Sequence, residues 1–206
     1  LHVRSRRQRQ MCIRDSNRTL WNTSISYPLM GSYWFITPKI TYSLTHYNDI
    51  KHARAEIDKS STRSLPIYSL GTGLIFERNS TVFGRETEQT LEPRLSYAYI
   101  PYRNQRHMPN FDSSSADLNF AELFTPNKYT GFDRIANTNQ LSAVLTTRYI
   151  DSGTGKEWFS ATVGQRYYFT DEKVDLYWSN PGKTKNRSDV LAASQFSLFE
   201  GWRLEG

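Results

Sequence analysis

Few residues of this 206-residue sequence combine a reactive type with a spacing that suits chemistry. His46, His52 and His107 are scattered and lack the regular spacing of metal ligands. The glycines of "GTGLIF" precede no predicted helix, so this stretch is not expected to bind phosphate. We therefore expect no catalytic residues, no metal site and no cofactor, and the protein is not predicted to be an enzyme.

Oxygen-bearing side chains gather in the middle of the chain. Asp112, Asp117, Glu122 and Asp133 could supply ligands to Ca²⁺, but they lack the regular D-x-D-x-D-G arrangement of a calcium loop. Ser113–Ser115 lie near a histidine and an aspartate, yet no nucleophile elbow surrounds them. This stretch is interpreted as a polar loop, and its function depends on the predicted strands that position it.

The net charge of +6 is unevenly distributed. Four of these charges come from residues 1–16, which hold five arginines, one aspartate and the only cysteine. The other 190 residues carry +2 with both signs mixed, so no nucleic-acid surface is expected. Residues 1–16 resemble a translated sequencing adapter, and a disordered basic arm is the alternative. We predict a non-native or disordered stretch there and expect the natural protein to extend upstream.

The rest of the chain alternates apolar and polar residues. In "EWFSATVGQRYYF" (157–169), the apolar residues Phe159, Val163 and Phe169 share one face of a strand, because successive side chains point to opposite faces. Apolar runs are far shorter than the roughly 20 residues of a spanning helix. The other alternating segments are 20–30, 33–47, 70–78, 89–100, 140–150 and 189–199, with a shorter strand at 173–178 and one helical turn in 119–124. This pattern predicts an antiparallel all-β fold.

Charged residues fall on the polar face of these predicted strands. In a soluble sandwich they would lie on the surface, whereas in an outer-membrane barrel they would line a hydrated lumen. Gln165 departs from the pattern on the apolar face, and either a bulge at Gly164 or a position near the membrane interface would explain it. The predicted lumen-lining residues are Lys39, Glu92, Arg94, Arg148, Ser160, Thr162 and Arg166.

Short and long spacers alternate along the chain. The long ones cover 48–64, 101–137 and 170–188, and short turns separate the other segments. This rhythm is typical of up-and-down outer-membrane barrels, which have short turns at one end and long loops at the other. A porin or receptor-type barrel and a soluble carbohydrate-binding β-sandwich are the alternatives.

Residues 65–200 resemble the LptD family of lipopolysaccharide-assembly proteins. The strings that carry this resemblance are "LEPRLSYAYIPYRNQ", "LFTPNKYTGFDRIANTNQL" and "LTTRYID...ATVGQRYYF". Residues 19–64 carry no such signature. The signature residues of the long loop are Pro101, Tyr102, Gln105, Phe124, Gly131, Asp133, Arg134, Asn139 and Gln140.

The resemblance implies a function in the outer membrane of a Gram-negative bacterium. A barrel of this family inserts lipopolysaccharide into the outer leaflet through a lateral opening. The implied partners are a plug lipoprotein, lipopolysaccharide, outer-membrane lipid and, through a missing N-terminal domain, periplasmic bridge components. Residues 17–206 are then one partial transmembrane β-barrel domain, an antiparallel up-and-down segment of about eight strands. We expect an open curved sheet with its apolar face convex.

The adjacent residues Asp133 and Arg134 permit two interpretations within this family. One is a salt bridge that folds the long loop back onto the barrel mouth. The other is a direct contact with lipopolysaccharide or with the plug.

Overall fold

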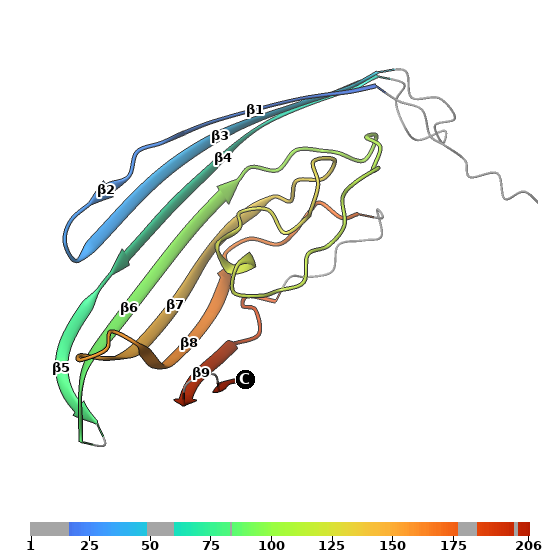
Figure 1. The fold of residues 1–206 in the computed structure, drawn as a ribbon. Helices are drawn as coiled ribbons and strands as arrows, with labels where there is room; N and C mark the ends of the chain where they lie inside the picture. Colours follow the sequence, from blue (N-terminus) through green and yellow to red (C-terminus); the bar gives the residue numbers. More distant parts are fainter. Residues whose placement is uncertain (1–16, 49–59, 83, 177–184, 200–201) are drawn as a thin grey trace, which may run out of the picture.

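A computed structural model describes residues 17–48, 60–82, 84–176, 185–199 and 202–206, which form one antiparallel sheet (Figure 1). Eight strands follow one another in the order β1-β3-β4-β6-β7-β8-β9-β10, while β2 pairs with β3 and β5 pairs with β6. Over these residues β1 and β10 are the two edges, so the sheet is open. The strands are β1 (Asn17–Ser26), β2 (Leu29–Met30), β3 (Trp34–Asn48), β4 (Ser61–Leu74), β5 (Phe76–Val82), β6 (Arg85–Ile100), β7 (Thr138–Asp151), β8 (Glu157–Tyr168), β9 (Leu191–Phe199) and β10 (Trp202–Glu205).

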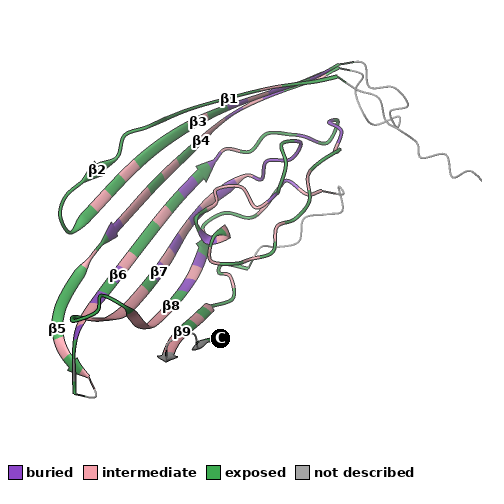
Figure 2. Cartoon of the chain, in the orientation of Figure 1, coloured by how far each residue is buried: buried purple, intermediate pink, exposed green. Residues whose placement is uncertain are grey.

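The predicted all-β, antiparallel up-and-down class is confirmed, and the register explains the alternation in the sequence. Ile40 of β3 lies opposite Tyr68 of β4, which lies opposite Tyr99 of β6, so apolar positions fall in rows across neighbouring strands. Leu145 of β7 and Val163 of β8 form another such pair. Exposed and more buried residues consequently alternate along much of β3, β4 and β6, whereas β1 is almost entirely exposed (Figure 2). The apolar rows remain exposed because the described residues contain no second layer on that side.

Residues 101–137, between β6 and β7, lie within the curve of the sheet (Figure 1), and we call them the docked segment. They contact residues near one edge, on β1 and β3, and residues of β8 toward the other, from the same face. Only the concave face offers both contacts at once. Leu65, Ile100 and Ile135 form one small apolar cluster under this segment, and Tyr129, Ala136 and Val174 form another.

Several details differ from the sequence-based expectations. The short strand predicted at 173–178 is wrong over its described residues 173–176, because Val174 packs beneath Tyr129 and not in the sheet. The spacer 48–64 is shorter than expected because β4 already begins at Ser61. The helical turn expected within 119–124 forms as the 3₁₀ helix η1 (Glu122–Phe124). No described helix is both long and apolar enough to span a membrane.

Gln165 follows the regular register and lies opposite Ala143, so the bulge considered at Gly164 is absent from this pairing. The irregularity of the β7–β8 pair lies between Tyr149 and Ile150 instead. The Gln165 side-chain amide donates a 2.9 Å hydrogen bond to the Ser188 carbonyl oxygen. Because this hydrogen bond pairs the polar amide near the loop end of β8, Gln165 can occupy the apolar face without a change in the register of the strand.

Gly164 gives a test of how closely the docked segment approaches β8. A Cβ atom at this position would lie 2.7 Å from Leu123 Cδ1 and 3.0 Å from Val144 Cγ2. We expect Gly164→Val to displace η1 and lower the free energy of unfolding by about 1–3 kcal/mol, because overpacking forces its neighbours apart. Denaturant unfolding in detergent measures this change. Gly71→Ala is the matched control, since no atom lies within 4 Å of its added Cβ, and equal stability of the two variants would contradict the prediction.

Candidate functional site on the inner face

The carboxylate of Asp133 is the centre of the contact between the docked segment and the sheet. Its side chain is fully buried and accepts hydrogen bonds from the Tyr47 hydroxyl and, at 2.9 Å, from Arg18 Nη1. The backbone N–H groups of Phe111 and Asp112 donate to its other oxygen at 2.6 and 2.9 Å. A buried carboxylate requires such partners, because an unpaired charge away from water is costly.

Arg63 of β4 binds the same part of the docked segment from below. Its guanidinium donates to the backbone oxygens of Phe132 and Asp133 at 2.6 and 2.7 Å and to Gln105 Oε1 at 2.9 Å. Gln105 in turn donates from Nε2 to the Ile135 carbonyl oxygen at 2.7 Å. The two ends of the docked segment are therefore held together by one buried arginine.

A tight turn brings Asp112 beside Asp133. Gly131 has a φ of 71°, and a Cβ there would lie 2.4 Å from the Asp112 carbonyl oxygen, so glycine is required. Asp112 Oδ2 lies 2.5 Å from Arg18 Nη1. Burial by itself would raise the pKa of Asp112, but the hydrogen bonds from Arg18 and the Phe132 backbone outweigh it and lower the pKa to about 2.

Arg134 forms hydrogen bonds within the docked segment itself. Its guanidinium donates to the carbonyl oxygens of Met108 and Pro109 at 2.7 and 2.8 Å. Burial lowers the pKa of Arg134 to about 10, so the side chain stays charged at neutral pH. The ion pair that folds the segment back therefore joins Asp133 to Arg18, while its neighbour Arg134 braces the loop from within.

A second contact fixes the docked segment to β8. Arg166 is buried and donates to the carbonyl oxygens of Glu122 and, at 3.3 Å, Thr125. Gln140 of β7 donates to the same Thr125 oxygen at 3.2 Å. Leu123 completes this contact by packing over Gly164.

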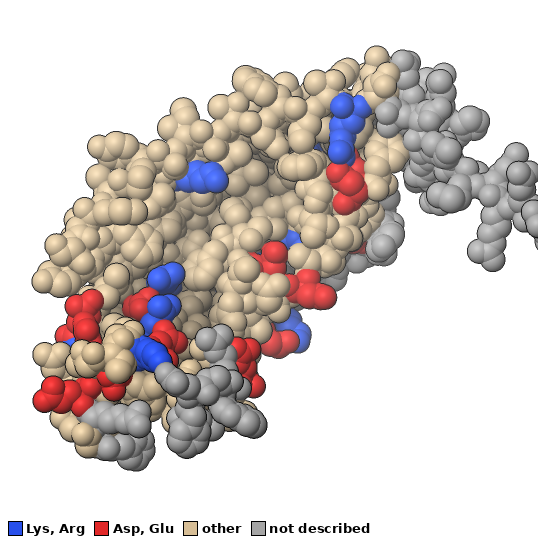
Figure 3. Space-filling model, viewed as in Figure 1, with Lys and Arg blue, Asp and Glu red and all other residues tan. Residues whose placement is uncertain are grey.

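A second group of charged residues of the inner face clusters nearer the short turns. Glu92 is buried and pairs with Arg94 at 3.1 Å and with Arg148 at 3.4 Å, and Arg148 also lies 3.9 Å from Glu157. Acidic and basic side chains are visible together in this region (Figure 3). Ser160 and Thr162 are half-buried beside this cluster, and Lys39 is exposed on β3. All seven predicted lumen-lining positions thus lie on one face of the sheet, the face that carries the docked segment.

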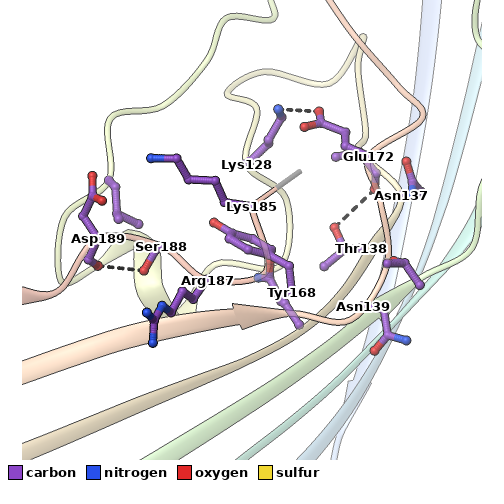
Figure 4. A pocket seen from close by; sticks show the side chains of 14 residues that line it. Lys128, Asn137, Thr138, Asn139, Tyr168, Glu172, Lys185, Arg187, Ser188 and Asp189 are labelled. Atoms are coloured by element: carbon purple, nitrogen blue, oxygen red, sulfur yellow. Dashed lines mark hydrogen bonds and ion pairs between the residues drawn. The ribbon is translucent and has the colours of Figure 1, made fainter. Parts of the chain in front are cut away.

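Two cavities adjoin the docked segment. One, of about 280 Å³, lies at the loop end between the docked segment and residues 168–172 and 185–189 (Figure 4). Lys128 pairs with Glu172 at its rim, and Tyr168 and Lys185 line it. The other cavity, of about 500 Å³, lies between β3, β4, β6 and residues 124–127.

Comparison with known proteins identifies the family. A family model described as "LPS transport system D" (LptD) matches residues 2–206. The LPS-assembly protein LptD of Paraburkholderia xenovorans is 42% identical over 196 residues, which cover 93% of this chain and 25% of that protein. LptD of Aromatoleum aromaticum is 47% identical over 179 residues, covering 87% of this chain and 22% of that protein.

The chain belongs to the LptD family. It spans about a quarter of the length of these curated relatives. The matched region contains the whole inner face described above, so the docked segment is part of an LptD sequence.

The structure gives the LptD signature residues different positions. Gln105, Gly131, Asp133, Arg134 and Gln140 converge on the contacts that hold the docked segment. Asn139 accepts a 2.9 Å hydrogen bond from the Tyr97 hydroxyl. The structure does not bring the remaining three into this network: Pro101 is half-buried, while Tyr102 and Phe124 are exposed.

Three residues of this network were missed by sequence reasoning: Arg18, Tyr47 and Arg63. Tyr47 carried a signal, because a large aromatic residue stands there in register with Thr41, Ser43 and Thr45 on the polar face. Arg63 falls within the polar spacer 48–64 of the sequence. Because β4 already begins at Ser61, Arg63 is a strand residue whose side chain is buried on the inner face.

We expect Asp133→Asn to release the docked segment. Asparagine offers one accepting oxygen where Asp133 offers two, so the two backbone N–H donors at its second oxygen lose their acceptor, at a cost of about 1–3 kcal/mol each. Trypsin cleavage after the exposed Arg103 and Arg106 should then become much faster. Tyr47→Phe removes one of the four donors to this carboxylate and should cost about 1.5–3 kcal/mol, because a hydrogen bond to a charged group is lost. The prediction fails if Asp133→Asn stays as resistant to trypsin as the wild type.

Acid should weaken the same contact. The pKa of Asp112 is lower in the folded protein than its ordinary value, so its contribution to stability is complete above about pH 4 and is lost as the pH falls toward 2. Pepsin, which is active in this range, should cleave the docked segment increasingly as the pH decreases from 4 to 2. The Asp112→Asn variant should lack this pH-dependent step, and an unchanged step in that variant would contradict the assignment.

Proposed function

We propose that this chain forms part of the wall of an outer-membrane barrel that inserts lipopolysaccharide into the outer leaflet of a Gram-negative bacterium. The proposal rests on membership of the LptD family, whose described role is lipopolysaccharide transport, and on the two faces of the sheet. This chain would form part of the path that lipopolysaccharide follows and part of the wall between the lumen and the membrane, without catalysing a covalent reaction.

The observation that carries the proposal is the uncharged outer face. Every second residue of 34–46, 62–74, 91–99, 139–149 and 159–167 points outward, and none of these positions holds Asp, Glu, Lys or Arg. Ile40, Leu95 and Val163 on this face are 53%, 44% and 43% exposed. An apolar band across five strands would favour aggregation in water, whereas lipid stabilises it.

Strand length fits the same environment. A tilted strand crosses the hydrocarbon core with about 9–11 residues. The five strands β3, β4, β6, β7 and β8 have 15, 14, 16, 14 and 12 residues. Tyr149, Trp158, Phe159 and Phe196 pack together near the short-turn end, where an aromatic girdle would meet the lipid headgroups.

We propose that the opposite face lines the barrel lumen. Lys39, Arg94, Arg148, Ser160 and Thr162 would then face a hydrated interior, where charge costs little. Glu92 and Arg166 belong to the same face but are buried there, Glu92 in its ion pairs and Arg166 beneath the docked segment. A polar wall of this kind favours passage of the saccharide part of lipopolysaccharide, while its acyl chains favour the membrane.

The proposed partners follow from the family and from this geometry. Lipid would cover the convex face, and a plug lipoprotein would occupy the lumen beside the docked segment. Periplasmic bridge components would be contacted by parts of the full-length protein other than this chain. The porin and soluble-sandwich alternatives are not favoured, since the family match points to lipopolysaccharide transport and a sandwich requires a second sheet over the apolar face.

Depletion of the full-length protein in the native bacterium tests the proposed function. We expect lipopolysaccharide at the cell surface to decrease while it accumulates inside the cell envelope. Surface labelling of lipopolysaccharide, compared with the total amount, measures the effect. Undiminished surface lipopolysaccharide after depletion would refute the proposal.

A pair of neighbouring substitutions tests which face meets lipid. Leu95→Arg should destabilise the membrane-inserted barrel by about 2–4 kcal/mol, because a charge near the bilayer midplane is costly. Ser96→Arg, one residue away on the inner face, should change this free energy much less. Unfolding from lipid vesicles in denaturant measures both. Equal costs for the two substitutions would exclude the proposed orientation.

A further inference from the structure

The cavity of about 500 Å³ between the sheet and residues 124–127 has the size of a small-molecule site, which is roughly 300–1,000 Å³. One wall is the inner face of β3, β4 and β6, and the opposite wall is the end of η1 with the residues that follow it. The cavity thus lies between the proposed barrel wall and the docked segment.

The charge of this cavity has one sign. Lys39 and Arg94 line it, and its other lining residues are uncharged. Arg94 pairs with Glu92 at 3.1 Å, yet its side chain remains 44% exposed. A basic group stands among uncharged atoms over the β3–β4 part of the sheet (Figure 3). The lining therefore favours an anionic occupant.

The register places the two cations apart. Lys39 lies opposite Ser69, and Arg94 lies opposite Gly73, so four residues of β4 separate their positions along the sheet. At about 3.3 Å per residue this offset is roughly 13 Å. Such a spacing suits an extended molecule with more than one anionic group better than a single phosphate ion.

The uncharged lining suits a saccharide. Hydroxyl groups of Thr37, Thr41, Ser69 and Ser96 offer hydrogen bonds, while the rings of Phe35 and Phe124 offer flat apolar surfaces. Sugar rings need both, because their hydroxyl groups lie at the edge and their C–H bonds form apolar faces. Phe124 is 40% exposed although it belongs to the LptD signature, and this cavity gives that exposed ring a use.

The wall opposite the sheet is fixed before any ligand binds. The carbonyl oxygen of Thr125 accepts hydrogen bonds from Arg166 and Gln140. The side-chain amide of Asn127 donates to the carbonyl oxygens of Tyr129 and Arg134 and accepts from the Ala136 N–H. A preformed wall lowers the conformational cost of binding.

We propose that this cavity binds an anionic oligosaccharide, with Lys39 and Arg94 holding separate anionic groups and Phe124 packing against a sugar ring. The inference rests on the proposed function, since the transported glycolipid supplies such a saccharide. It adds a specific binding site to what would otherwise be a polar surface.

Titration of the full-length protein with lipid-free core oligosaccharide tests this site. We compare the phosphorylated oligosaccharide with its dephosphorylated form, by calorimetry in detergent. The combined Lys39→Gln and Arg94→Gln variant should bind the phosphorylated form roughly tenfold more weakly, a loss of about 1.4 kcal/mol, because ion pairs made by exposed side chains are individually weak. Arg106→Gln is the matched control, since it removes an exposed charge of the docked segment outside the cavity.

Further variants separate the elements of the site. Phe124→Ala should weaken binding of both oligosaccharide forms, whereas Lys39→Arg should preserve it. Arg94→Gln also breaks the ion pair with Glu92. Lys39→Gln leaves that ion pair intact, and this single variant should weaken binding severalfold. A heat-dependent shift in gel migration verifies that each variant forms a folded barrel.

Two results would overturn the proposal. One is equal affinity of the double variant and the Arg106→Gln control for the phosphorylated oligosaccharide. The other is competition by inorganic phosphate as strong as that by the oligosaccharide. Either result leaves the transport function standing, because that function is tested separately by surface lipopolysaccharide after depletion.

Discussion

A single-layer sheet has two faces, and each face must have side chains that suit the environment it contacts. In this protein the outward positions of five strands are uncharged, whereas the inward positions include Lys39, Glu92 and Arg166. Because side chains alternate with a period of two, a slip of one residue in any strand would exchange the faces. The exposed apolar rows, the inner charges and the position of the docked segment all depend on this register.

The docked segment stays in place mainly through polar contacts. Its apolar clusters are small, while Asp133, Arg63 and Arg166 each make several buried hydrogen bonds. Buried charges add little net stability, but they penalise any arrangement that leaves one of them unpaired. This network therefore favours one arrangement of a 37-residue connection over the many that a loop of that length could adopt. The same fixed arrangement provides a firm wall for the cavity beside Phe124.

Much of the fold was predictable from the sequence, and the limits have physical causes. Ten-residue alternation and the short and long spacers predicted an antiparallel up-and-down sheet, which the pairing confirms. The strand expected at 173–178 is absent from its described residues 173–176, because Val174, in a short apolar stretch, packs against Tyr129 and not in the sheet. Arg63 was missed since no local pattern marks a strand that begins within a polar spacer. Gln165 is irregular in the sequence pattern alone, because the Ser188 carbonyl oxygen that accepts a hydrogen bond from its amide lies 23 residues away along the chain.

The sequence by itself determined the class of the fold and the two faces of the strands, because both follow from local spacing. Its motifs, by their resemblance to known sequences, indicated the LptD family. Only the tertiary structure decided what the signature residues do. Asp133 is adjacent to Arg134 in the chain, yet its ionic partner is Arg18, 115 residues away. Contacts over such separations depend on how the sheet curves and where a long connection folds back. The alternation of apolar and polar residues along a strand determines neither of these properties.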